Sequence, residues 1–177
     1  MKKFFPYLAF SLFLLIAVFA SLNLVLQKNV TLFSRATTDK PQIWILPTKI
    51  EGEKDKVYTL KILLDTNNQE ISGVDLVLKY DNQIIEVVDN NIKPGVIFDY
   101  YRDKLVDNRK GIIKLSSQGK FKGQGTFATL EIKGKSSGEG KLEVVTPKIS
   151  LDSTIIWDSQ GKENILGPTQ GLVVRFY

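Results

Sequence analysis

The sequence contains no cysteine and no histidine among its 177 residues. The lack of cysteine excludes a disulfide framework and a thiol nucleophile, and the lack of histidine excludes the imidazole base of a Ser-His-Asp triad. Structural zinc held by Cys and His is excluded as well. A folded region of about 140 residues buries enough surface to be stable without cross-links. The composition therefore suits an exported protein with a full hydrophobic core.

The N-terminal segment lacks acidic residues. It contains the basic residues Lys2, Lys3, Lys28 and Arg35 and no Asp or Glu before residue 37. The whole chain has 24 basic and 19 acidic residues, so residues 37–177 carry a net charge of only +1. A nucleic-acid-binding domain carries its excess of Lys and Arg on the folded part, because neutralising phosphates drives that binding. We therefore expect no nucleic-acid partner.

An uncharged, mostly apolar run extends from Leu8 to Leu26. It is long enough to cross the roughly 30 Å of hydrocarbon in a bilayer. Lys2 and Lys3 precede the run, which favours a cytoplasmic N-terminus and an extracytoplasmic remainder. Because the run is apolar on all sides, it lacks the amphipathic stripe of a helix packed on a soluble core.

Two interpretations of this segment remain open. Its length favours an uncleaved membrane anchor, because the apolar part of a cleaved signal peptide usually has about 7–15 residues. Small residues in Val18-Phe19-Ala20 and Ser34-Arg35-Ala36 offer sites for cleavage. Both interpretations predict a signal-peptide or signal-anchor helix over residues 1–27, a linker over 28–41 and a folded domain over 42–177. Both place that domain outside the cytoplasm, either held to the membrane by the helix or secreted.

After residue 41, apolar and polar residues alternate with a period of two. The clearest runs are Val57–Leu64, Val74–Tyr80 and Phe127–Lys133. Such alternation predicts strands that bury one face on a core. Gly, Asn, Asp and Pro separate the runs at short spacing, and no window of a dozen residues has a convincing helical period. The sequence therefore predicts an all-β, nine-stranded jelly-roll β-sandwich preceded by one N-terminal transmembrane or signal helix.

Five segments resemble, in the same order, those of the cohesin domain, the jelly-roll module of cellulosomal scaffoldins and related bacterial surface proteins. These segments are Glu51–Tyr58, Ile71–Val88, Lys93–Phe98, Asn108–Leu115 and Gly125–Lys133. The most specific one has the pattern Gly-φ-Asp-φ-x-φ-x-Tyr-Asp followed by φ-Glu-Val, where φ is apolar. The resemblance covers about residues 43–177. It implies a non-catalytic module that docks a calcium-loaded dockerin through one sheet face.

The resemblance also indicates which residues belong to the docking surface. Asp75 matches an Asp of the family's docking strand, whereas Gly73 replaces an Asn that often precedes that Asp by two residues. The neighbouring docking strand maps to Ile112–Gln118, where alternation points Ile113, Leu115 and Ser117 inward and the intervening residues outward. The predicted partner-binding residues are Asp75, Val77, Lys79, Lys114, Ser116 and Gln118. We predict no catalytic residue, metal ligand or cofactor.

Aromatic residues leave a second binding function open. Trp44 and Trp157 are interpreted as core residues, because sandwich cores use many aromatics, but exposed rings stack on sugars. The alternative function is therefore a carbohydrate-binding module that recognises polysaccharide at the cell surface. Tyr100 and Tyr101 are predicted to form an exposed pair in a loop. Asp75 itself has a second interpretation, as an ordinary polar residue on a solvated strand face.

Several acidic residues have a structural interpretation that competes with a chemical one. Tyr80-Asp81 is predicted to end a strand and start a turn. Asp152, Asp158 and Glu163 faintly resemble a calcium loop, but their spacing favours a hairpin turn. A glycoside hydrolase needs two carboxylates about 5–10 Å apart, yet no acidic residue lies in a recognisable catalytic motif. We therefore expect a binding protein rather than an enzyme.

Overall fold

The computed structural model describes residues 39–88, 91–147 and 152–177. Residues 38–177 form one compact unit. Every regular element in these described ranges is a β-strand, and no helix there has the length and apolarity needed to span a bilayer. The predicted signal or anchor helix over residues 1–27 and most of the predicted linker over residues 28–41 lie outside the described residues.

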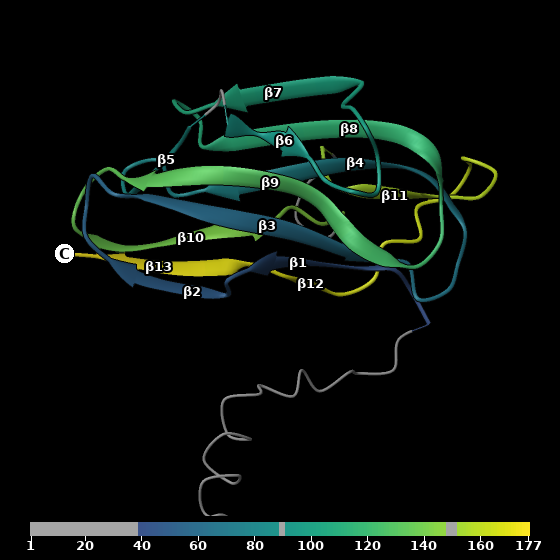
Figure 1. Ribbon diagram of the computed structural model, residues 1–177, viewed down its shortest axis with the longest axis horizontal. Helices are drawn as coiled ribbons and strands as arrows, with labels where there is room; N and C mark the ends of the chain where they lie inside the picture. Colours follow the sequence, from purple (N-terminus) through teal and green to yellow (C-terminus); the bar gives the residue numbers. More distant parts are fainter. Residues whose placement is uncertain (1–38, 89–90, 148–151) are drawn as a thin grey trace, which may run out of the picture. The chain divides into compact units, whose positions relative to one another are not determined.

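Six strands form the first sheet (Figure 1). In spatial order they are β12 (Thr169–Gln170), β1 (Gln42–Leu46), β3 (Val57–Asp65), β9 (Gln124–Gly134) and β5 (Ile85–Val87), and β6 (Lys93–Pro94) also pairs with β9. The alternation expected in β3 is present, since Leu60, Ile62 and Leu64 are fully buried whereas Thr59 and Lys61 are exposed. This pattern turns one side of the sheet toward the core and the other toward solvent.

Seven strands form the second sheet (Figure 1). In spatial order they are β2 (Lys49–Gly52), β13 (Leu172–Phe176), β10 (Gly138–Val144), β4 (Ile71–Tyr80), β8 (Ile112–Phe121) and β7 (Asp103–Asp107), and β11 (Ile155–Asp158) also pairs with β4. Strand β4 therefore lies in the middle of the sheet. It pairs with β8 along one side and with β10 and β11 along successive parts of the other side.

The two sheets share one hydrophobic core. Members from the long strands include Ile43, Ile45, Leu60, Ile62, Leu64, Leu130 and Ile132 of the first sheet and Val74, Leu76, Leu78, Ile113, Leu115, Leu142 and Val174 of the second. The predicted all-β sandwich of two sheets is therefore confirmed. The described residues contain thirteen strands rather than nine. The additional strands include β5, β6 and β12, which have only two or three residues and are too short to show a period in the sequence.

The end of β4 is fixed by a turn and a hydrogen-bonded tyrosine. β4 ends at Tyr80, and the Asp81 carboxylate accepts a hydrogen bond from the backbone N–H of Gln83 at 3.0 Å, as the predicted turn requires. The Tyr80 hydroxyl donates to Asn108 Oδ1 at 2.6 Å, and Asn108 also binds the backbone N–H and C=O of Val87. Burial raises the pKa of Tyr80 to about 12. This network holds β4 in place relative to β5 and to the turn before β8.

Candidate docking face

The outward side chains of β7, β8, β4 and β11 form one continuous surface, which we call the β8–β4 face. Strand register arranges them in three adjacent rows: Asp103, Ser116, Asp75 and Ile155 in the central row, Leu105, Lys114 and Val77 on one side, and Gln118, Gly73 and Trp157 on the other. These rows bring together five of the six predicted partner-binding residues, Asp75, Val77, Lys114, Ser116 and Gln118. The face is thus built by pairing of segments that are far apart in the sequence.

The alternation predicted for β8 is confirmed. Ile113, Leu115 and Ser117 are buried, whereas Lys114 and Ser116 are half-buried on the outer side. The Ser117 hydroxyl donates to the backbone C=O of Tyr100 at 3.0 Å, so this buried polar group has a partner. Gln118, on the same outer side, is exposed.

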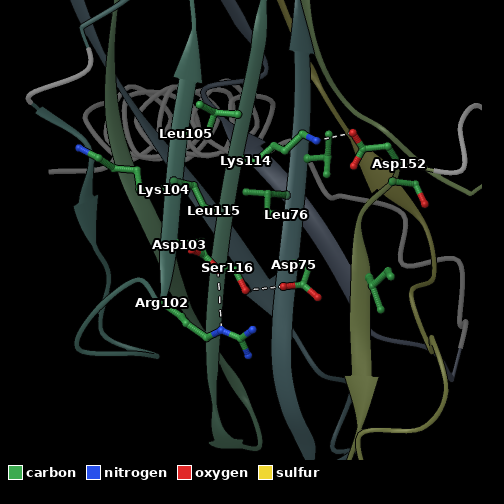
Figure 2. Close-up of a pocket in the computed structure, with 13 residues that line it drawn as sticks. Asp75, Leu76, Arg102, Asp103, Lys104, Leu105, Lys114, Leu115, Ser116 and Asp152 are labelled. Carbon is green, nitrogen blue, oxygen red and sulfur yellow. Dashed lines mark hydrogen bonds and ion pairs between the residues drawn. The ribbon is translucent and has the colours of Figure 1, made fainter.

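Asp75 lies at the centre of the β8–β4 face, and both of its carboxylate oxygens accept hydrogen bonds. Figure 2 shows the bond from Ser116. The Ser116 hydroxyl from β8 donates to Oδ1. The Trp157 indole N–H from β11 donates to Oδ2 at 2.7 Å. Three neighbouring strands therefore contribute to one polar cluster.

Two ion pairs lie beside this cluster. The Lys114 ammonium on β8 pairs with the Asp152 carboxylate (Figure 2). Arg102 Nε lies 3.7 Å from the carboxylate of Asp103, and the backbone N–H of Arg102 donates to the C=O of Ser116 at 2.7 Å. Both cations thus have an acidic neighbour in or next to the β8–β4 face, so these pairs add little net charge to it.

Val77 lies on the face but is only 7% exposed. Strands β10 and β11 pair with successive parts of β4, and Val77 lies where one gives way to the other. Val145, just after β10, and Thr154, just before β11, both bond to the backbone of Val77. Its C=O accepts hydrogen bonds from the Val145 N–H at 2.9 Å and from the Thr154 hydroxyl at 3.0 Å, and its N–H donates to Thr154 Oγ1. A partner therefore has access to little of the Val77 side chain.

Lys79, the sixth predicted residue, is exposed but lies at the border of the face, because its cross-strand neighbours are Ile112 and Glu143. Beyond it lies the other part of the same outer surface, which we call the charged half. The charged outward residues on β10, β13 and β2 are Glu139, Lys141, Glu143, Arg175, Lys49 and Glu51, and the half-buried Val173 lies on the same side between Lys141 and Lys49. Arg175 pairs with Glu139 at 2.8 Å and Lys49 with Glu51 at 2.6 Å.

The surface next to the Asp75 cluster is hollowed. One hollow of about 300 Å³ is lined by Trp157, Gln118 and Arg102, among others. Its floor includes Gly73, where an added Cβ would lie 2.8 Å from the backbone oxygen of Ser117. The absence of a side chain at Gly73 therefore permits both the close pairing of β4 with β8 and the hollow. A second hollow of about 520 Å³ continues between β7 and Asp152.

The expectation that both tryptophans are core residues is wrong. Trp44 and Trp157 are half-buried on the outer faces of the two sheets, because their neighbours Ile43, Ile45 and Ile156 occupy the inward positions. Both tryptophans lie in short strands next to isoleucines. Because apolar residues occupy consecutive positions there, the sequence pattern does not show whether the tryptophan or the isoleucines face the core. The residues that sequence reasoning missed are thus Trp157 and Arg102, which line the same hollow.

The prediction that Tyr100 and Tyr101 are both exposed is confirmed for Tyr100 and wrong for Tyr101. Tyr100 is 64% exposed, whereas the ring of Tyr101 packs against Phe127 with centroids 6.0 Å apart. The Tyr101 hydroxyl donates to the C=O of Lys93 at 2.8 Å, and burial raises the pKa of Tyr101. Tyr101 therefore fixes the loop that leads into β7, and Tyr100 faces solvent.

The segment after β11 forms the predicted hairpin turn. The Asp158 carboxylate accepts hydrogen bonds from the backbone N–H groups of Lys162 at 2.7 Å and Glu163 at 3.2 Å, and these bonds lower the pKa of Asp158. After the turn, Asn164 forms a bridge with Trp157. Within the described residues, no group of three or more acidic side chains is placed to hold a metal ion.

Comparisons with known proteins agree with this fold. The model of the cohesin domain family matches residues 45–169. Among solved structures, CaCohA2 from Clostridium acetobutylicum is similar with a TM-score of 0.60 and 13% identity, over 77% of this chain and 92% of that chain. No curated protein matches the sequence.

Two similar structures are complexes. The Coh-OlpC–Doc435 type I cohesin–dockerin complex from Clostridium thermocellum has a TM-score of 0.60 and 16% identity, over 78% of this chain and 95% of that chain. The third ScaB cohesin of R. flavefaciens, in complex with a group 1 dockerin, has a TM-score of 0.57 and 10% identity, over 80% of this chain and 97% of that chain. At these identities the structural likeness shows the fold alone. The family model covers most of the chain, and the chain therefore belongs to the cohesin domain family, whose modules are non-catalytic binding domains.

Proposed function

We propose that the domain is a docking module that binds a dockerin-type protein through the β8–β4 face, as part of an extracytoplasmic scaffold or adhesion assembly. Membership of the cohesin family supports a protein partner, and two structurally similar cohesins were solved in complex with dockerins. The apolar run from Leu8 to Leu26, preceded by lysines, supports display outside the cytoplasm, with or without cleavage. Mass spectrometry of the mature N-terminus distinguishes anchoring from secretion.

One observation supports the β8–β4 face above the rest of the surface. Its outward residues combine apolar side chains, such as Leu105 and Ile155, with polar groups that are already bonded within the protein, such as Asp75 and Lys114. The centres of protein interfaces are depleted in unpaired charge, because removing a charge from water is costly. The two hollows on this face also provide space for side chains of a partner.

The test uses residues 38–177, which contain the whole core, as bait for a displayed library of calcium-loaded dockerin modules. The tightest-binding dockerin then serves as the probe for variants. The double variant Lys114→Ala/Gln118→Ala should weaken binding by about tenfold, because truncation of central contacts costs about 1–2 kcal/mol. The matched double variant Lys49→Ala/Lys141→Ala, in the charged half, should bind within about twofold of the parent.

Either of two outcomes would contradict the proposal. One is that no dockerin in the library binds the domain. The other is that binding is lost in the charged-half variant and retained in the variant at Lys114 and Gln118.

Polysaccharide binding remains the second candidate, favoured by the position of Trp44 on the solvent side of β1. Its cross-strand neighbours there are Leu63 and Gln170, so an aromatic ring lies beside an apolar and an amide side chain. Retention of the domain on insoluble polysaccharide, lost on Trp44→Ala and kept on Trp157→Ala, would support this function over docking.

A further inference from the structure

Asp75 uses its carboxylate inside the domain. Both oxygens accept hydrogen bonds from the same chain, one from the Ser116 hydroxyl and one from the Trp157 indole N–H. Hydrogen bonds to a charged acceptor are stronger than bonds between neutral groups, so the carboxylate holds both donors in fixed orientations. Asp75 therefore orients the large indole ring of Trp157, which reaches it diagonally from β11.

The backbone that carries Trp157 is fixed independently of any partner. Asn164 Oδ1 accepts hydrogen bonds from the N–H groups of Ile156 at 3.1 Å and Leu166 at 3.0 Å. Asp158 holds the intervening turn through the backbone N–H groups that follow it. An aromatic side chain on a fixed hairpin loses little conformational entropy on binding, which is the property of a strong interface contact.

The hollow beside Trp157 has a distinct chemical character. Ser116 and Gln118 contribute neutral polar groups, and Gly73 leaves the floor open. The charged groups are Asp75, which is bonded to two donors, and Arg102, whose guanidinium lies near the Asp103 carboxylate. Because Asp75 is hydrogen-bonded on both oxygens and Arg102 lies beside Asp103, an uncharged side chain of a partner that enters the hollow breaks no ion pair and needs no counter-charge.

We propose that Trp157 is the main contact for the dockerin-type partner, which places an uncharged side chain against the indole and over Gly73. Asp75 acts as a positioning residue that holds Trp157, rather than as a charged contact. This inference rests on the proposed docking function and assigns the partner-facing role to a residue outside the set predicted from the sequence.

A double-mutant cycle with the selected dockerin as probe tests this assignment. Trp157→Ala should weaken binding by about 30-fold or more, as expected for an aromatic at the centre of an interface. Asp75→Ala should weaken it by about tenfold in the parent domain but by less than twofold in the Trp157→Ala background. If Asp75 acts through Trp157, its own effect disappears once Trp157 is gone.

The conservative variant Asp75→Asn separates positioning from charge. Its amide keeps an oxygen for the Trp157 indole N–H, and its NH2 group donates to the Ser116 hydroxyl. We expect affinity within about threefold of the parent, with an unchanged unfolding midpoint by circular dichroism. Equal losses for Asp75→Asn and Asp75→Ala would overturn the positioning role.

A spectroscopic measurement tests the contact without truncating Trp157. The chain has two tryptophans, so Trp44→Phe leaves Trp157 as the only indole in residues 38–177. Addition of the selected dockerin should shift the fluorescence of Trp157 to shorter wavelength as the ring leaves water. Binding without such a shift, or an effect of Asp75→Ala that persists in the Trp157→Ala background, would overturn this inference while leaving dockerin binding intact. Absence of any dockerin binder would instead remove the proposed function.

Discussion

The outer surface of the second sheet has two halves with different chemistry. In the charged half, Arg175 lowers the pKa of Glu139 and Lys49 lowers the pKa of Glu51, so its exposed residues neutralise each other in water. In the β8–β4 face, the acid Asp75 binds neutral donors and lies beside a hollow. Two parts of one sheet can therefore share backbone geometry and still differ in their suitability for a partner, because desolvating hydrated ions is costly.

A substitution that fills the β8–β4 face should have the largest effect on binding. Ser116→Arg places a long cation between Asp75 and Asp103 and over the hollow, so we expect dockerin binding to fall by about 100-fold or more. Thr59→Arg, on the outer side of the first sheet opposite Glu131, is the control and should bind as the parent does. Isothermal titration calorimetry measures both. Parent-like binding by Ser116→Arg would place the partner elsewhere.

Stability should respond to a different residue from binding. Asn108→Ala removes three hydrogen bonds and leaves the Tyr80 hydroxyl and the backbone of Val87 without their partners. We expect a loss of about 2 kcal/mol in the free energy of unfolding, measured by urea denaturation. Affinity at 25 °C should stay within about twofold, because Asn108 does not reach the outer face. An unchanged unfolding curve would show that this network is not a stabilising one.

Acid should disturb the hairpin that carries Trp157. Hydrogen bonds hold the pKa of Asp158 below its ordinary value of 3.8 in the folded domain. Such a group stabilises the fold above the ordinary value, and its contribution is lost as the pH falls through the lower folded value. In the Trp44→Phe domain, Trp157 fluorescence should change below about pH 3.8, and Asp158→Asn should lack that transition. The same transition in both proteins would assign it to another group.

The smallest effect is expected in the charged half. The Glu139–Arg175 pair is exposed, and exposed ion pairs contribute little to stability. The double variant Glu139→Gln/Arg175→Gln should therefore unfold at the parent's temperature and bind the same dockerin with the same affinity. A loss of affinity in this variant would show that the two halves are not functionally distinct.

Much of the sandwich could be predicted because long strands repeat their alternation many times. The alternation of β3, β4 and β8 identified the inward residues, and it also placed Lys114, Ser116 and Gln118 on one outer side. The family resemblance then added Asp75, which pairs with Ser116 across the two strands. Local pattern and family motif together therefore located most of the face.

The remaining features depend on contacts between distant segments. Val77 is covered because Val145 and Thr154, more than sixty residues further along the chain, bond to its backbone. Trp157 faces outward because the four-residue strand β11 pairs with β4 in one register, which a strand so short does not specify by its own alternation. No sequence pattern predicts the hydrogen bond from Trp157 to Asp75, although this bond fixes two side chains at the centre of the β8–β4 face.

Recognition through the β8–β4 face is tested most directly by nuclear magnetic resonance of the labelled domain during titration with the selected dockerin. The two tryptophans give two indole N–H signals, one from each sheet, and the backbone amides report on both halves of the second sheet. We predict that the Trp157 indole and the amides around Asp75 and Ser116 shift, whereas the Trp44 indole and the amides around Glu139 do not. Shifts confined to Trp44 or to the charged half would contradict recognition through the β8–β4 face.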